Sequence, residues 1–104
     1  MRGSSLLTLL MLMPAPVVHA DDRAALVRLV RQDCGSCHGM TLKGGLGTPL
    51  TPQALREKPV ESMAATILYG RAGTPMPAWK SMLSEADAEW IAGRLQEGFP
   101  EESR

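Results

Sequence analysis

Apolar residues recur at helical spacing in several stretches of the chain, and no stretch alternates with period two for long enough to predict a strand. The first stretch predicts a helix from about Asp22, whose side chain can cap it, to about Asp33. Its apolar positions, with arginines on the opposite side, are Leu26, Val27, Leu29 and Val30. A helix is therefore expected to lead directly into residue 34.

Glycine and proline separate the elements that follow. Residues 43–50 contain three glycines and a proline, which predicts a loop. Thr51 offers an N-cap with Pro52 at the first helical position, so a short helix to about Arg56 is expected. A further helix begins at Pro59 and should end at Gly70.

The last helix opens with Ser84-Glu85-Ala86-Asp87, a near-match to a capping box, and should close at Gly98. Its apolar positions lie on overlapping turns: Ala88, Ile91, Ala92 and Leu95. Trp90 fits either the core or a contact with the first helix. The pattern as a whole predicts an all-α domain of about four short helices.

The first twenty residues differ from this domain. One basic residue, Arg2, precedes an apolar run at 6–13, and small residues lie near Ala20. This layout is typical of a secretory signal peptide, and the run is shorter than the roughly 18 residues needed to span a bilayer. We predict a cleaved signal peptide over 1–20, a domain over 21–104, export to the periplasm and no membrane span after cleavage.

Charge and size then limit what the domain can do. Cleavage removes only Arg2 among the charged residues, so the formal net charge moves from zero to minus one, which gives nucleic-acid binding no support. A domain this small often needs a disulfide, a metal or a cofactor for stability. With only two cysteines in the chain, their spacing decides between these options.

Cys34 and Cys37 are followed at once by His38, which completes the Cys-x-x-Cys-His pattern of c-type haem attachment. A disulfide, a thioredoxin-like pair and a zinc site are the alternatives. A helical pattern, not a strand, precedes the motif, and structural zinc would want four protein ligands. We predict one haem c per chain, bound covalently through Cys34 and Cys37, with His38 as an axial iron ligand.

The second axial ligand is expected to be Met76, because His19 leaves with the signal peptide. Pro75 and Pro77 fix the backbone on both sides of Met76, which lowers the ordering entropy of ligation. The other candidates are less suitable. Met40 is too near His38, and Met63 lies in a predicted helix. Met82 has no proline on either side to fix its backbone.

These residues resemble the class I c-type cytochromes, and are most similar to the cytochrome c55X group associated with cytochrome cd1 nitrite reductase. The stretches that carry the resemblance are 33–39, 42–47, 73–79, 83–88 and 97–100. The resemblance implies the small class I cytochrome c fold around one haem. Many class I cytochromes have Gly-Pro in the loop after the motif, and the proline carbonyl accepts a hydrogen bond from the ligand histidine. Here the proline comes one residue later, because Thr48 stands between Gly47 and Pro49. Thr48 would therefore have to supply the carbonyl that holds His38.

The predicted function is one-electron transfer and not catalysis. The resemblance implies cytochrome cd1 nitrite reductase as acceptor in denitrification. The alternative is a role as electron acceptor for a haem d1 maturation enzyme, in the final step of haem d1 biosynthesis. An open iron site that binds gases is a third hypothesis, disfavoured by the loop around Met76. Lys43, Arg71 and Lys80 form either a basic rim for an acidic partner or three solvated charges.

Overall fold

The computed structural model describes residues 19–102, and for residues 19–21 it describes the backbone alone. All but the last two residues of the predicted signal peptide lie outside this range. The elements in chain order are α1 (His19–Leu29), η1 (Val30–Cys34), α2 (Gly35–His38), α3 (Pro52–Leu55), α4 (Val60–Tyr69) and α5 (Glu85–Glu97). No strand occurs between residues 19 and 102, as predicted.

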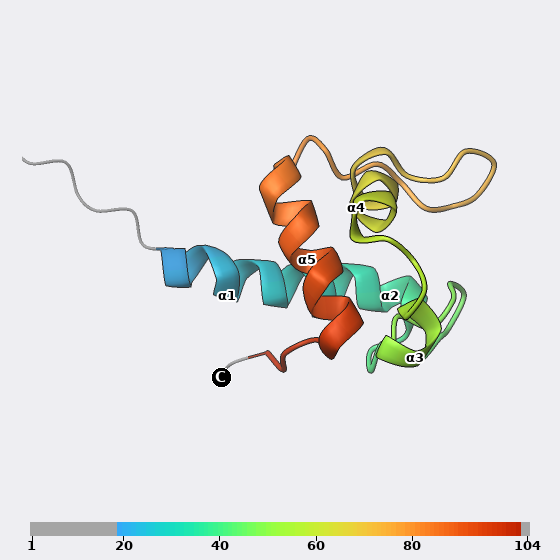
Figure 1. The fold of residues 1–104 in the computed structure, drawn as a ribbon, viewed down its shortest axis with the longest axis horizontal. Coiled ribbons are helices and arrows are strands. Elements are labelled where there is room, and N and C mark those ends of the chain that lie inside the picture. The colour runs from blue at the N-terminus through green and yellow to red at the C-terminus, as the bar shows by residue number, and fades with distance from the viewer. Residues whose placement is uncertain (1–18, 103–104) are drawn as a thin grey trace, which may run out of the picture.

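The first three elements form one continuous helical rod, so the described chain has four helical segments (Figure 1). The rod changes from α to π geometry over Val30–Cys34, where the Gly35 N–H bonds to the Val30 carbonyl. Cys34 keeps helical angles, φ −68° and ψ −37°, and the rod ends at Gly39, whose φ is +94°. The end predicted near Asp33 is therefore wrong, because helical backbone carries through the motif.

The predicted cap at Asp22 is also wrong. The helix α1 begins at His19, three residues earlier, and an N-cap residue needs non-helical backbone angles. The Asp22 carboxylate is exposed in the first turns of α1, where a negative charge still interacts favourably with the helix dipole.

The remaining helix ends agree with prediction. The Thr51 side chain accepts a hydrogen bond from the Ala54 N–H at the start of α3. The helix α4 lies between Pro59 and Gly70. At the start of α5, Ser84 and Asp87 form a reciprocal capping box, each side chain accepting from the other residue's backbone N–H at 3.0 Å.

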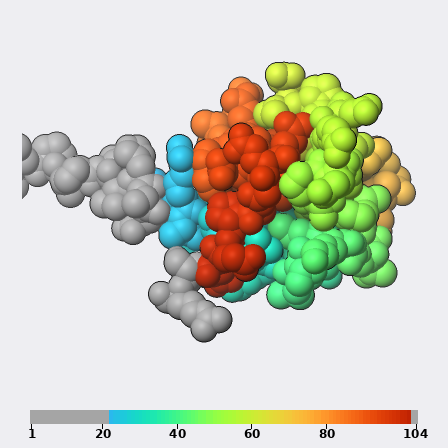
Figure 2. Space-filling view, turned by 60° about the horizontal axis from the view of Figure 1, so that its bottom comes forward, coloured from blue at the N-terminus to red at the C-terminus, as the bar shows by residue number. Residues whose placement is uncertain are grey.

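The core lies where α4 and α5 pack together and against the rod. Its most enclosed large side chains are Val30 from η1 and Ile91 from α5, with 0% and 1% of their surface exposed. On the face shown in Figure 2, α5 separates the first helix from the green residues between α2 and α4. A Gln96 amide from α5 donates to the carbonyls of Leu55 and Lys58, which fixes α3 against α5.

The residues after α5 are held to the rod by Arg31. Its guanidinium donates to the carbonyl oxygens of Phe99 at 2.7 Å and Pro100 at 3.0 Å, and lies over the Phe99 ring. Trp90 meets Phe99 edge-on, with ring centroids 6.2 Å apart, and receives the Arg23 guanidinium on its face. Trp90 therefore contacts the first helix while also packing against the core.

Candidate functional site

The two cysteines lie on one turn at the end of the rod. Cys34 is the last residue of η1 and is half-buried, whereas Cys37 is in α2 and is exposed. Both thiols are free, and Ser36 Oγ lies 4.0 Å from Cys37 Sγ. The helical backbone therefore presents two separate thiols a single turn apart, followed directly by His38.

The protonation of Cys34 argues against a redox-active cysteine pair. Burial, together with the nearby charges of Asp33 and Cys37, raises the pKa of the Cys34 thiol to about 11. Disulfide oxidoreductases need the opposite, a thiol whose pKa is lowered so that the thiolate can attack. The raised pKa at Cys34 therefore does not favour the thioredoxin-like alternative.

His38 is oriented by a backbone carbonyl from the following loop. Its Nδ1 lies 2.7 Å from the Thr48 carbonyl oxygen. Because a carbonyl can only accept, Nδ1 is the donor in this contact, and in the neutral imidazole Nε2 then keeps its lone pair. This is the tautomer that binds a metal through Nε2, with the second ring nitrogen held by an outer partner. Thr48 supplies the carbonyl despite the displaced proline.

The loop that provides this carbonyl folds back onto the end of α2. The Gly47 N–H bonds to the Cys37 carbonyl at 2.7 Å, and the Gly44 N–H bonds to the His38 carbonyl at 2.8 Å. A Cβ built on Gly47 would lie 2.6 Å from His38 Nδ1, closer than real side chains approach. Only glycine lets this backbone lie so close to the imidazole.

The sequence reasoning did not identify Gly47 as a functional residue. The signal was present, since four glycines follow the motif within ten residues. What was missing was the fold of the loop, which alone brings Gly47 to the face of the imidazole.

These observations satisfy the requirements of a covalently held haem. Two free thiols on one turn, an imidazole with Nε2 available and a glycine cradle beside the imidazole form one continuous segment. The residue types are those that c-type haem attachment needs at this spacing. The residues present therefore fit haem c.

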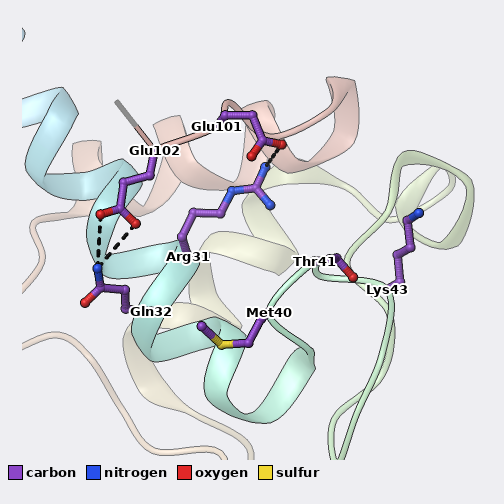
Figure 3. A pocket seen from close by; sticks show the side chains of 7 residues that line it. All are labelled: Arg31, Gln32, Met40, Thr41, Lys43, Glu101 and Glu102. Carbon is purple, nitrogen blue, oxygen red and sulfur yellow. Dashed lines mark hydrogen bonds and ion pairs between the residues drawn. The ribbon is translucent and has the colours of Figure 1, made fainter. Parts of the chain in front are cut away.

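The depression drawn in Figure 3 is a different place on the surface. It lies between η1, the segment after α2 and the C-terminal residues. Charged and polar side chains dominate its lining, and neither cysteine nor His38 contributes. Its lining residues are Arg31, Gln32, Met40, Thr41, Lys43, Glu101 and Glu102.

Met76 lies in the long loop between α4 and α5, and is half-buried. Two residues beyond Pro77, the Trp79 N–H bonds to the Ile67 carbonyl at 3.1 Å, and the Trp79 ring packs against the core. The loop is thus anchored to α4 on the C-terminal side of Met76. Ligation by Met76 itself stays a prediction.

The three other methionines within residues 19–102 occupy the places that the sequence predicts for them. Met63 is buried in α4, with 8% of its surface exposed, and belongs to the core. Met40 and Met82 are exposed, at 64% and 62%. Met63 therefore has a packing role that accounts for it without a ligand.

The basic residues named from the sequence all lie in loops. Lys43, Arg71 and Lys80 are exposed, and Lys80 Nζ lies 5.5 Å from the centre of the Tyr69 ring. The loops that contain them, residues 39–50 and 70–83, hold no aspartate or glutamate. None of the helices between residues 19 and 102 has the length and apolar character required to cross a membrane.

Comparison with known proteins gives matches over most of the chain. Residues 21–93 match the family described as cytochrome C oxidase, cbb3-type, subunit III. The chain is 60% identical over 82 residues to cytochrome c55X of Pseudomonas aeruginosa, covering 77% of this chain and 69% of the relative. The solved structure of the c-type cytochrome NirC matches with a TM-score of 0.75 and 58% identity, over 76% of this chain and 93% of that one.

A second kind of relative is much larger than this chain. Dihydro-heme d1 dehydrogenase of Pseudomonas aeruginosa is 37% identical over 75 residues, which cover 71% of this chain but only 15% of the dehydrogenase. The similarity is therefore confined to one part of that protein.

Proposed function

Since the chain belongs to the c-type cytochromes, in the group of cytochrome c55X and NirC, we propose that it carries electrons to cytochrome cd1 nitrite reductase in denitrification. Members of this family are electron-transfer proteins that use haem c. The observation that supports iron ligation is the 2.7 Å contact between His38 Nδ1 and the Thr48 carbonyl, which would leave Nε2 free to bind iron. The role in denitrification is supported by the similarity to cytochrome c55X and NirC.

One haem is held by this chain's own residues. Cys34 and Cys37 would bind it as thioethers, and His38 and Met76 would supply the two protein ligands to its iron. When bound, the haem supplies an iron that alternates between ferric and ferrous states by one electron. Thioether ligation opposite histidine raises the reduction potential, and a second protein ligand excludes small molecules from the iron.

The precursor is exported to the periplasm. Residues 1–20 act as the signal peptide and are cleaved, so the working protein is residues 21–104. In an oxidising compartment a free Cys-x-x-Cys pair would close into a disulfide. Covalent attachment of haem prevents this, because it consumes both thiols.

Partner recognition uses the loops at residues 39–50 and 70–83, which hold no aspartate or glutamate and are called the acid-free loops. Lys43, Arg71 and Lys80 lie in these loops, and an acidic surface on the acceptor would be attracted to them. The attraction raises the encounter rate more than the strength of the final complex, which suits a carrier that must dissociate after each electron.

Rapid mixing of the reduced holo-protein with oxidised cytochrome cd1 nitrite reductase tests this function. We expect the visible spectrum of the ferrous protein to decay to the ferric form, with a rate proportional to the concentration of the reductase. No electron transfer to the reductase, in a preparation that still oxidises with ferricyanide, would refute the nitrite reductase assignment.

A second candidate is supported by the similarity to dihydro-heme d1 dehydrogenase. In this alternative, the ferric protein accepts electrons in the final step of haem d1 biosynthesis. A dehydrogenation removes two electrons and two protons, so each turnover would reduce two molecules of this one-electron carrier. Mixing the ferric protein with the dehydrogenase and its substrate should therefore give a 2:1 ratio of reduced carrier to product.

A further inference from the structure

The loop between α4 and α5 contains a side chain that is placed to hold Met76. We propose that Thr74 is a positioning residue for Met76, and that its hydroxyl keeps the methionine in the orientation needed for ligation. This inference rests on the proposed role of Met76 as the second axial ligand. The hydrogen bonds of Thr74 would then explain why ligation by Met76 is stable.

The hydroxyl of Thr74 connects two points of the loop. It donates to the Arg71 carbonyl at 2.7 Å and accepts from the Met76 N–H at 3.3 Å. The Thr74 N–H also bonds to the Arg71 carbonyl, at 3.1 Å, and the Arg71 N–H bonds to the Met76 carbonyl at 3.4 Å. Residues 71–76 are therefore closed into a ring that includes the Thr74 hydroxyl.

A second contact fixes this ring against the end of α4. A Cβ built on Gly70 would lie 2.7 Å from the Met76 carbonyl oxygen and 2.9 Å from the Pro77 carbonyl carbon. The φ of Gly70 is +71°, a value that side chains rarely adopt. Gly70 thus lets the Met76 backbone lie directly on the helix end, while Thr74 holds it from the other side.

Pro75 limits the backbone hydrogen bonds available to the loop. Proline has no N–H, so the residue before Met76 cannot donate a backbone hydrogen bond. The N–H of Met76 itself is held by the Thr74 hydroxyl. In Figure 1 the loop between α4 and α5 extends outward past α4.

The loss of this hydroxyl should loosen Met76 and leave the fold intact. Thr74 is exposed, so water can satisfy the groups that it releases. The loop would then sample orientations in which the Met76 sulfur points away from the iron. Each such excursion lets an external ligand compete for the vacated position.

The test uses the holo-protein and the variant Thr74→Val, which removes the hydroxyl and keeps the shape. We expect the ferrous variant to bind carbon monoxide, and the ferric variant imidazole, about tenfold more readily than the parent, the change that one hydrogen bond typically brings. Thr74→Ser, which restores the hydroxyl, should return both values towards those of the parent. Thr74→Ala removes the hydroxyl without adding a methyl group, should Thr74→Val fold poorly.

Thr66→Val is the matched control. Thr66 also donates its hydroxyl to a backbone carbonyl, that of Ser62, at 3.0 Å, but within α4 and outside the ring. Ligand binding by Thr74→Val equal to that of the parent and of Thr66→Val would overturn the positioning role alone. Ready carbon monoxide binding by the parent would instead overturn ligation by Met76, and this inference with it.

Discussion

The Nδ1 of His38 and the carbonyl oxygen of Thr48 lie 2.7 Å apart, joining the end of the helical rod to the loop that follows it. Ten residues separate the two in sequence, and a backbone group makes the contact, so the side chain of Thr48 is not what the site requires. The same loop brings Gly47 against the imidazole. The orientation of His38 therefore depends on how closely the loop backbone at Gly47 can approach the imidazole.

Gly47→Ala should disturb His38 directly. The new Cβ would lie 2.6 Å from Nδ1, so either the imidazole turns or the loop moves and the bond to Thr48 lengthens. We expect a lower yield of holo-protein and a changed visible and electron paramagnetic resonance spectrum. Gly93→Ala, in α5 where a Cβ meets nothing within 4 Å, is the control and should leave the spectrum unchanged. Identical spectra for both variants would contradict this account.

Covalent attachment can be tested on a denaturing gel stained for haem. We expect the haem to stay with the unfolded chain, and to be lost when Cys34 and Cys37 are both replaced by serine, because no thioether can then form. Ser36→Ala, between the two cysteines, should keep the haem. Release of haem from the parent chain under denaturing conditions would show that attachment is not covalent.

Met76→Ala should open the iron. We expect loss of the methionine-to-iron charge-transfer band, a lower reduction potential and carbon monoxide binding to the ferrous form. Met82→Ala, which changes an exposed methionine of the same loop, should behave as the parent. A parent protein that lacks the band and binds carbon monoxide would favour the gas-binding hypothesis instead.

Electron transfer to the nitrite reductase should depend on salt. If Lys43, Arg71 and Lys80 guide the encounter, the bimolecular rate constant should fall about tenfold or more from low to high ionic strength. Lys80→Glu should lower the rate at low salt and flatten this dependence, whereas Lys58→Glu, outside both acid-free loops, should change it little. A rate that salt does not alter would identify the three cations as ordinary solvated charges.

Arg31→Ala should destabilise the holo-protein without altering its spectrum. The Arg31 side chain is only 13% exposed and satisfies two carbonyls, so its loss leaves both without a donor. We expect the free energy of unfolding, measured with denaturant, to fall by about 2 kcal/mol. Its exposed ion pair with Glu101 should contribute little of this. Arg28→Ala, on the exposed side of α1, should have a negligible effect; equal losses for the two variants would contradict the role of Arg31.

Helix boundaries that depend on neighbouring residues could be predicted from the amino-acid sequence. The cap at Thr51, the start at Pro59 and the capping box at Ser84 were all predictable, because each acts on backbone groups within three or four residues. The attachment motif is equally local, since it consists of five consecutive residues, and covalent attachment through it stays a prediction. The ligand roles of His38 and Met76 stay predictions.

Features that depend on backbone groups far away in the sequence could be seen only in the folded chain. The rod passes through both predicted ends, Asp22 and Asp33, since helical angles continue on either side of each residue. Arg31 meets carbonyls 68 and 69 residues away, and carbonyls carry no sequence signal at all. For the same reason the acceptor for His38 and the steric need for Gly47 were set by how the loop folds back, because every residue offers the same carbonyl and only the fold selects one.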